Sequence, residues 1–225
     1  MIRSLKSLLR PTPASLMSNA EFDAMVLPAF EAVLAPLGFT QRSNRLWLRS
    51  ADAPIRQTFQ IELWKGAAAS PSWGVSLDFV PHRTGERFAW HRTEASARPD
   101  LSVSDQSKPN SLTMLTDRAG LQDQLVRLIP RAMNEAQRFW EAGRQIDQLP
   151  ALFDQVEAEI GVTRKGFPFD MRPQLGLAKA FAHRAAGQDG QAKALLEEWI
   201  ATQARHAPLP VVAVDDLWRR FDSIP

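Results

Sequence analysis

Cysteine and tyrosine are absent from the 225-residue sequence, and their absence excludes several kinds of chemistry. Without cysteine there is no disulfide framework, no thiolate nucleophile and no cysteine-ligated metal or iron–sulfur site. Glycine is scarce, with 11 residues, and the phosphate-loop motifs GxxxxGKS/T and GxGxxG do not occur. A GxSxG nucleophile elbow is missing too. The nucleophiles that remain are Ser, Thr, Lys, His and carboxylate side chains.

A large excess of one charge sign is also missing. Lys and Arg number 27 against 25 Asp and Glu, a formal net charge of +2, and both signs are interspersed along the chain. This is not the clustered basic footprint of a dedicated nucleic-acid binder. No apolar run approaches the ~20 residues that a membrane span needs, so no membrane partner is expected. The composition suits a cytoplasmic protein, and the length allows a core that folds without a metal or cofactor.

Residues 18–37 predict the first helix. Ser18 and Glu21 have the spacing of a capping box, in which each side chain accepts a hydrogen bond from the other residue's backbone amide. Apolar residues then recur every three or four positions, as one face of a helix requires. Gly38 is a typical C-terminal stop. Pro28 lies inside the pattern and is expected to kink or split the helix.

Alternating residues predict an antiparallel sheet after this helix. The expected strands are 45–49, 55–64 and 73–80, with a fourth over 87–92. The side chains assigned to the two faces of the first two strands are Leu46, Leu48, Ile55, Phe59, Ile61 and Leu63 on one face, and Arg45, Trp47, Arg49, Arg56, Thr58, Gln60, Glu62 and Trp64 on the other. The first helix is expected to cover the apolar face.

The rest of the chain is predicted to be helical after a polar loop. Residues 93–116 are rich in Ser and Pro and are interpreted as a loop or linker, with a short edge strand at 100–104. Helical spacing follows over 121–140, 152–160, 175–185 and 192–200. The apolar run 211–214 is interpreted as extended, before a final turn of helix.

These elements predict an α+β fold, with an N-terminal helix on a short antiparallel sheet followed by a helical C-terminal half. The expected division is a loose leader over residues 1–16, an α+β domain with the antiparallel sheet over 17–105, and a helical region over 106–225.

The polar face of the sheet is the first candidate binding surface. Five of its side chains are singled out: Arg45, Trp47, Arg49, Arg56 and Trp64. Trp and Arg are enriched at binding hot spots, and when interleaved they suit stacking with single-stranded nucleic acid. The alternative is that the C-terminal helices cover this face. Changing Trp47 and Trp64 together to Ala separates the two readings, because loss of folding would identify them as core.

A metal or acid–base site is the second candidate. The residues at and after the end of the third strand that point to it are Asp78, His82, Glu86, His91 and Glu94. Two imidazoles and a carboxylate are able to bind a divalent ion and activate water. The spacing matches no known ligand motif, and scattered polar residues of an exposed loop explain it equally. His183 and His206 are interpreted as structural or solvated.

The segment 164–173, RKGFPFDMRP, is the third candidate, because basic and aromatic residues alternate in it between two helices. Binding residues often lie on loops held by a rigid scaffold, which favours a recognition loop. The alternative, which we prefer, is a plug that places Phe167 and Phe169 in the helical core.

Three short motifs within residues 20–90 have counterparts in a known family. They are Leu37-Gly38-Phe39 after the first helix, Trp47-Leu48-Arg49 in the first strand and Phe59-Gln60 in the second. In these places the chain resembles the bacterial domain-of-unknown-function family 4304. That family has no established activity, so the resemblance implies no catalytic residue. Its members are small bacterial cytoplasmic proteins, which implies an accessory or immunity-type role.

The absence of a catalytic motif and the Arg and Trp candidates together favour a non-enzymatic bacterial protein that binds a protein partner, without a cofactor. One alternative is a metal-dependent hydrolase that uses His82 and His91. The other is a binder of single-stranded nucleic acid that uses the Arg and Trp face.

Overall fold

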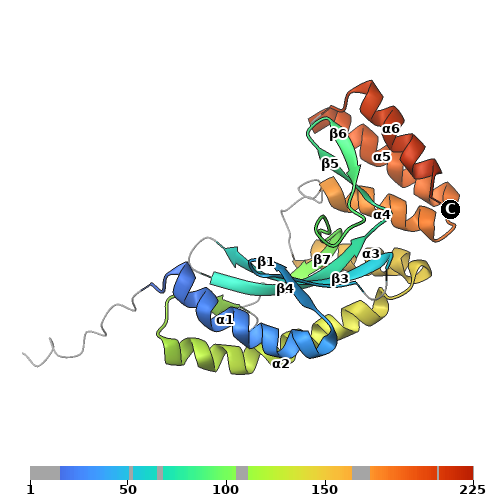
Figure 1. The fold of residues 1–225 in the computed structure, drawn as a ribbon. Coiled ribbons are helices and arrows are strands. Elements are labelled where there is room, and N and C mark those ends of the chain that lie inside the picture. Colours follow the sequence, from blue (N-terminus) through green and yellow to red (C-terminus); the bar gives the residue numbers. More distant parts are fainter. Residues whose placement is uncertain are drawn as a thin grey trace, which may run out of the picture.

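Helices and an antiparallel sheet make up the chain, as expected for the α+β class. The computed structural model describes residues 16–50, 53–64, 68–104, 111–163, 173–206 and 208–224. An N-terminal helix precedes the sheet and the C-terminal half is helical (Figure 1), so the predicted fold class is confirmed.

The described residues form six α-helices and eight strands. The helices are α1 (Asn19–Leu34), α2 (Arg118–Ala142), α3 (Leu149–Thr163), α4 (Pro173–Ala185), α5 (Asp189–His206) and α6 (Val211–Asp222). The strands are β1 (Thr40–Ser43), β2 (Leu46–Arg49), β3 (Ile55–Trp64), β4 (Ala68–Leu77), β5 (Pro81–Thr84), β6 (Arg87–Trp90), β7 (Leu101–Ser104) and β8 (Leu112–Thr113). Short 3-10 turns, η2 (Ala35–Leu37) and η4 (Ile146–Gln148), follow α1 and precede α3.

The first helix forms as its sequence predicts. The Ser18 hydroxyl accepts from the Glu21 amide at 3.2 Å, and the Glu21 carboxylate accepts from the Ser18 amide at 3.0 Å. Gly38 ends the following 3-10 turn with φ of 83°, a left-handed conformation that glycine adopts at little cost. Pro28 does not split the helix, which continues to Leu34.

The main sheet is antiparallel throughout, in the order β1-β2-β3-β4-β7, with β8 also paired to β4. The predicted edge strand in 100–104 is confirmed as β7, so the segment 93–116 is not only a loop. The sequence patterns missed β1, β5 and β8. The fourth predicted strand corresponds to β6, which pairs with β5 in a separate two-stranded sheet.

An aromatic row on one face of the sheet forms the centre of the core. Trp47, Phe59 and Trp73 lie directly opposite one another on β2, β3 and β4. The Phe59 ring centroid is 5.2 Å from that of Phe30 in α1 and 6.5 Å from that of Trp140 in α2. Helices α1 and α2 therefore cover this face of the sheet (Figure 1).

The face prediction for β2 was wrong. Trp47 was assigned to the wetter face, but the register places it beside Phe59 under α1 and α2, where it is fully buried. Leu48 points to the opposite face, next to Thr58, and is also buried. Both faces of this short strand are covered, so alternation alone does not tell them apart.

The C-terminal helices pack on the β5–β6 hairpin. Phe88 contacts Trp199 of α5 and Trp90 contacts Phe181 of α4, with ring centroids 6.2 and 6.4 Å apart. The guanidinium of Arg220 in α6 lies 5.1 Å from the centroid of the Trp90 ring. Figure 1 shows the hairpin and α4 to α6 on the other side of the sheet from α1 and α2.

Two further expectations concern the C-terminal half. Residues 211–214, predicted to be extended, are instead the first turn of α6, which begins after Pro210 and buries Leu217 and Phe221. Residues 164–172 of the proposed recognition loop or plug lie outside the described residues, and Pro173 begins α4.

We predict that Gly74→Ala destabilises the fold by about 2–3 kcal/mol, because overpacking a close contact forces the backbone apart. Gly74 lies on the interior strand β4, where an added Cβ would meet the Leu101 carbonyl oxygen and lie 2.9 Å from the Ser102 Cβ. The matched control is Gly190→Ala in α5. A Cβ added there meets no atom within 4 Å beyond its chain neighbours and the backbone of its own helix. Urea unfolding measures both, and equal free energies of unfolding for the two variants would contradict the prediction.

Candidate functional site

The five predicted binding residues do not form one surface. Trp47 is fully buried, and its indole N–H donates to the Glu31 carboxylate of α1. Trp64 lies at the far end of β3 on the opposite face, with its indole N–H donating to the Ser70 hydroxyl at 2.7 Å. At 38% exposure Trp64 is the more accessible of the two tryptophans.

The three arginines of this set serve separate parts of the fold. Arg45, in the turn before β2, pairs with Asp23 of α1 through two hydrogen bonds of 2.7 and 2.8 Å. The Arg49 guanidinium lies 5.7 Å from the centroid of the Phe39 ring. Arg56 is buried on the other face of the sheet. The prediction of a continuous Arg and Trp surface was therefore wrong, and Trp47 is not available to stack on a nucleic-acid base.

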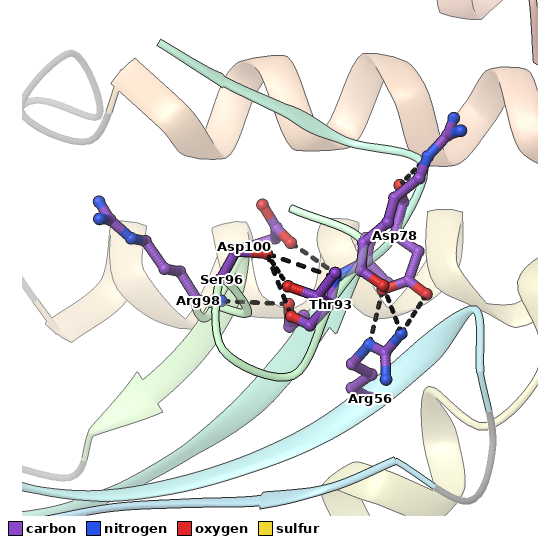
Figure 2. A network of polar contacts seen from close by, with 9 residues as sticks. Arg56, Asp78, Thr93, Ser96, Arg98 and Asp100 are labelled. Carbon is purple, nitrogen blue, oxygen red and sulfur yellow. Dashed lines mark hydrogen bonds and ion pairs between the residues drawn. The ribbon is translucent and has the colours of Figure 1, made fainter. Parts of the chain in front are cut away.

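Arg56 belongs to a polar network at the end of the sheet (Figure 2). Its guanidinium binds both carboxylate oxygens of Asp78, each at 2.7 Å, and donates to the Arg92 carbonyl at 2.8 Å. A planar guanidinium matches a carboxylate in this two-point geometry, which fixes both side chains. The pair ties β3 to the residue that follows β4, and the bond to the Arg92 carbonyl ties β3 to the segment that follows β6.

A buried cluster of two histidines and one aspartate lies next to this network. His82 of β5 and His91, just after β6, have ring centroids 4.1 Å apart. The Nε2 of His82 is 2.8 Å from Oδ1 of Asp100, whose side chain is fully buried. The Leu77 amide donates to the other Asp100 oxygen at 2.7 Å. The cluster joins the β5–β6 hairpin to the main sheet, because Asp100 immediately precedes β7.

The orientation of His91 follows from its partner. Its Nδ1 lies 2.6 Å from the Ser96 carbonyl oxygen, which only accepts, so Nδ1 carries the hydrogen in this contact. Its Nε2 is buried, and no described residue hydrogen-bonds it. Each histidine is only 8% exposed, which leaves a substrate little direct access to the rings.

Burial shifts the proton affinities of this cluster. It lowers the pKa of His91 below its ordinary value, while the hydrogen bond to the Ser96 carbonyl opposes the shift. Burial raises the pKa of Asp100, and the contact with His82 and the bond from the Leu77 amide offset part of that rise. Burial also lowers the pKa of His183, which is bonded to Gln188 in the α4–α5 hairpin.

Of the five residues proposed for a metal or acid–base site, only His82 and His91 lie next to each other. His82 and His91 meet, but Asp78 is held by Arg56, Glu86 is exposed in the β5–β6 turn and Glu94 pairs with Arg42. Among the described residues, no group of three or more His, Cys, Asp or Glu side chains has a geometry that could hold a metal ion. The hydrolase alternative therefore stays a prediction, and elemental analysis of the purified protein tests it.

Asp100 is the member of the cluster that sequence reasoning missed. It was placed in a polar loop, although it stands at the start of the edge strand predicted over 100–104. Its partners, Leu77 and His82, are at least 18 positions away along the chain. Only the pairing of β7 with β4 brings Asp100 to them.

A shallow apolar groove runs between α1 and α2 on the outer side of the helical layer. Its volume is about 350 Å³, and the residues that line it are Met25, Ala29, Gln122, Leu125, Val126, Ile129 and Pro130. Val126 is 66% exposed. At the start of the two helices, the exposed Leu16 and Leu115 flank a hydrogen bond of 3.0 Å from the Met17 amide to the Met114 carbonyl.

A second groove, of about 480 Å³, lies between α4, α5 and α6. Its walls include Arg184, Asp189, Lys193 and Glu197, and Arg184 pairs with Asp189. Charges of both signs alternate there and partly neutralise each other. The α1–α2 groove is therefore the more apolar of the two.

Comparisons with protein-family models, with curated proteins and with solved structures gave no match to this chain. The resemblance of residues 20–90 to family 4304 therefore stays a prediction. Within the described ranges, no helix combines the length and the apolar character needed to cross a bilayer.

We predict that Trp47→Ala lowers the free energy of unfolding by about 3–5 kcal/mol, as for other large buried aromatic residues. Trp64→Ala is the matched control. It should lower the free energy of unfolding by at most about 1.5 kcal/mol, because the Trp64 ring is partly exposed and makes one hydrogen bond. Urea unfolding followed by circular dichroism measures both variants. A Trp47→Ala protein as stable as Trp64→Ala would contradict the burial described for Trp47.

We also predict that acidification destabilises the protein through His91 and His183. Both have a folded-state pKa below the unfolded value, so their contribution to stability is present above about pH 6.5 and is lost as the pH falls through the folded pKa. Asp100 has the opposite sign, because its raised pKa costs stability as the pH rises above about 4.

The measurement is the free energy of unfolding between pH 7.5 and 5.5, for the wild type and for His91→Gln. The wild type should lose stability toward pH 5.5, by at most about 1.4 kcal/mol per pH unit for each histidine. His91→Gln should have the shallower slope, and adding His183→Gln should flatten it further. Equal slopes in the wild type and His91→Gln would show that His91 does not contribute.

Proposed function

We propose that this protein is a non-enzymatic binding protein that holds a protein partner in the groove between α1 and α2. The observation that supports this most directly is the apolar lining of the groove, in which Val126 and Pro130 are exposed. A contiguous apolar patch on a folded protein often marks an interaction site. Val126 projects from its α2 wall at 66% exposure, although the same helix buries Leu121, Leu125 and Leu128.

The distribution of exposed apolar side chains points to the same layer. The described residues include six large apolar side chains that are exposed: Leu16, Trp64, Leu115, Val126, Val211 and Val212. Three of them, Leu16, Leu115 and Val126, belong to the α1–α2 layer or to the segments that lead into its helices. Val211 and Val212 instead begin α6, and neither lines one of the two grooves described above.

The architecture supports a binding role for this surface. Helices α1 and α2 are anchored on their inner side by Phe30 and Trp140, which contact the aromatic row of the sheet. A groove between two anchored helices is largely preformed, so a partner does not have to order it on binding. An amphipathic helix in such a groove is a recurrent mode of peptide recognition. A bacterial accessory or immunity-type role is compatible with this proposal and rests on the family resemblance alone.

We predict that Val126→Glu abolishes capture of the partner without unfolding the protein. A charge in the apolar wall would have to be desolvated on binding, whereas an exposed substitution changes stability by about 0.5 kcal/mol or less. The measurement is affinity purification of the tagged full chain from a lysate of its source cells after nuclease treatment. Retained proteins are compared quantitatively by mass spectrometry.

The matched control is Val212→Glu, which places the same charge at a valine with 75% exposure on α6. The proposal expects one protein to be retained by the wild type and by Val212→Glu and to be lost with Val126→Glu. Retention of the same proteins by all three chains would overturn it, and so would the absence of any retained protein.

A further inference from the structure

A polar pocket lies at the C-terminal end of α2, where η2, the end of β2 and the start of β3 meet this helix. Its volume is about 230 Å³, and Leu37 and Trp140 form its apolar wall. This is less than the ~300–1,000 Å³ of sites for drug-sized ligands, but several times the ~30 Å³ that one water molecule occupies. The pocket shares no lining residue with the α1–α2 groove, so the two sites are separate.

Gln57 is the most buried polar side chain of this pocket, at 4% exposure. The other buried side chains on the same face of β3 are apolar: Ile55, Phe59 and Ile61. The Oε1 of Gln57 is buried, and no described residue donates a hydrogen bond to it. The nearby Trp140 indole donates instead to the Gly74 carbonyl, at 3.1 Å. A buried amide oxygen without a donor is costly, so Gln57 calls for a donor that enters the pocket.

Arg49 lies beside Gln57 and is positioned by the core. The two residues are directly opposite each other on β2 and β3, so their side chains leave the same face of the sheet. The Arg49 guanidinium donates to the Leu37 carbonyl at 3.4 Å and lies 5.7 Å from the centroid of the Phe39 ring. A guanidinium that is already positioned loses little freedom on binding, and its planar shape matches the two oxygens of a carboxylate.

Charges of both signs line the exposed side of the pocket. Arg144 and Glu141 are both exposed there, and 3.9 Å separates their closest nitrogen and oxygen atoms. An exposed pair at this distance contributes little energy, so both charges are able to bind a ligand. Because α2 ends at Ala142, the negative end of its dipole also lies here and favours a cation. The pocket therefore offers guanidinium groups to an anion and negative charge to a cation.

We propose that this pocket binds a free α-amino acid, at a site that the proposed function does not require. The α-carboxylate binds the guanidinium groups of Arg49 and Arg144. The α-ammonium donates to the Oε1 of Gln57, and Glu141 and the end of α2 favour its charge. An α-hydroxy acid shares the essential chemistry, which is a carboxylate with a donor on the adjacent carbon. It lacks the positive charge that Glu141 favours.

Other occupants match fewer of these groups. Sulfate binds arginine but brings no hydrogen to the Gln57 oxygen, and Glu141 repels it. A simple amine pairs with Glu141 and Gln57 but leaves the guanidinium groups without a use. Water donates to Gln57, but it gives no reason for two guanidinium groups to line the same pocket.

The test is isothermal titration calorimetry and thermal unfolding of the full chain with free L-amino acids at millimolar concentration. The preferred amino acid is then compared with analogues that change one group. L-alanine, L-lactate and propionate differ only in the group on the α-carbon, which is an ammonium, a hydroxyl or a hydrogen. L-aspartate, L-malate and succinate form a second such series, and L-alaninamide lacks the carboxylate.

The expected result is that at least one amino acid binds and raises the unfolding temperature, because a ligand of the folded chain stabilises it. The α-hydroxy analogue should bind more weakly. The analogue without a donor should bind at least about tenfold more weakly, because it leaves the Gln57 oxygen unpaired. An analogue without a donor that binds as tightly as the amino acid would overturn the inference.

Two variants assign the binding to this pocket. Gln57→Leu replaces the amide by an apolar group of similar size, so the fold should stay at least as stable while the affinity falls at least about tenfold. Arg144→Ala changes an exposed residue and should weaken binding without changing the unfolding temperature of the ligand-free chain. The matched control is Arg87→Ala, at an exposed arginine of β6, which should keep the wild-type affinity.

Three outcomes would count against the inference. If no amino acid or hydroxy acid binds at millimolar concentration, it is overturned. Binding that both Gln57→Leu and Arg144→Ala leave unchanged would place the ligand elsewhere and overturn it as well. An α-hydroxy acid that binds more tightly than its amino acid would support the carboxylate and the donor but overturn the ammonium. None of these outcomes bears on partner capture by the α1–α2 groove, which Val126→Glu tests.

Discussion

The pairing of Trp47 with Phe59 across two antiparallel strands determines how the rest of the protein is arranged. It places three aromatic side chains in one row, and Phe30 and Trp140 bring α1 and α2 onto that row. An indole buried in a core needs a partner for its N–H, and Glu31 supplies one from α1. The contact therefore fixes the register of β2, the buried face of the sheet and the position of the first helix together.

The opposite face of the sheet, by contrast, buries polar side chains. Its buried positions include Thr58, Ser70 and Ser72, whose hydroxyl groups require hydrogen-bond partners. The Ser70 hydroxyl accepts from the Trp64 indole, and the Ser72 hydroxyl donates to the Glu62 carboxylate. At the end of this sheet, Asp100 and the two adjacent histidines attach the β5–β6 hairpin, on which α4 to α6 pack. The C-terminal helices are thus linked to the sheet through polar as well as apolar contacts. We expect changes in protonation there to affect the stability of the fold.

Much of the fold could be predicted from local patterns, but little of the site could be. The capping box of Ser18 and Glu21 and the apolar spacing of α2 require only neighbouring residues, and both were found. Strand β2 has four residues, so its alternation fits either face, and only the register with β3 shows that Trp47 is core. Asp100 acquires its role from strands that are distant in sequence. The valines that start α6 have high strand propensity, and the packing of Leu217 and Phe221 overrides it.

The groove between α1 and α2 is also shaped by proline. Pro130 lines it, and Pro28 is exposed on α1, yet both helices continue through these positions. Proline has no backbone N–H, so the Val126 carbonyl lacks its usual donor four residues later. A backbone carbonyl buried without a partner is costly, whereas water satisfies it at the surface. An occupant of this groove, as proposed above, would have to leave that carbonyl solvated or supply a donor to it. A purely aliphatic occupant that sealed the wall would do neither, whereas an amphipathic helix with its polar flank beside α2 would do one or the other.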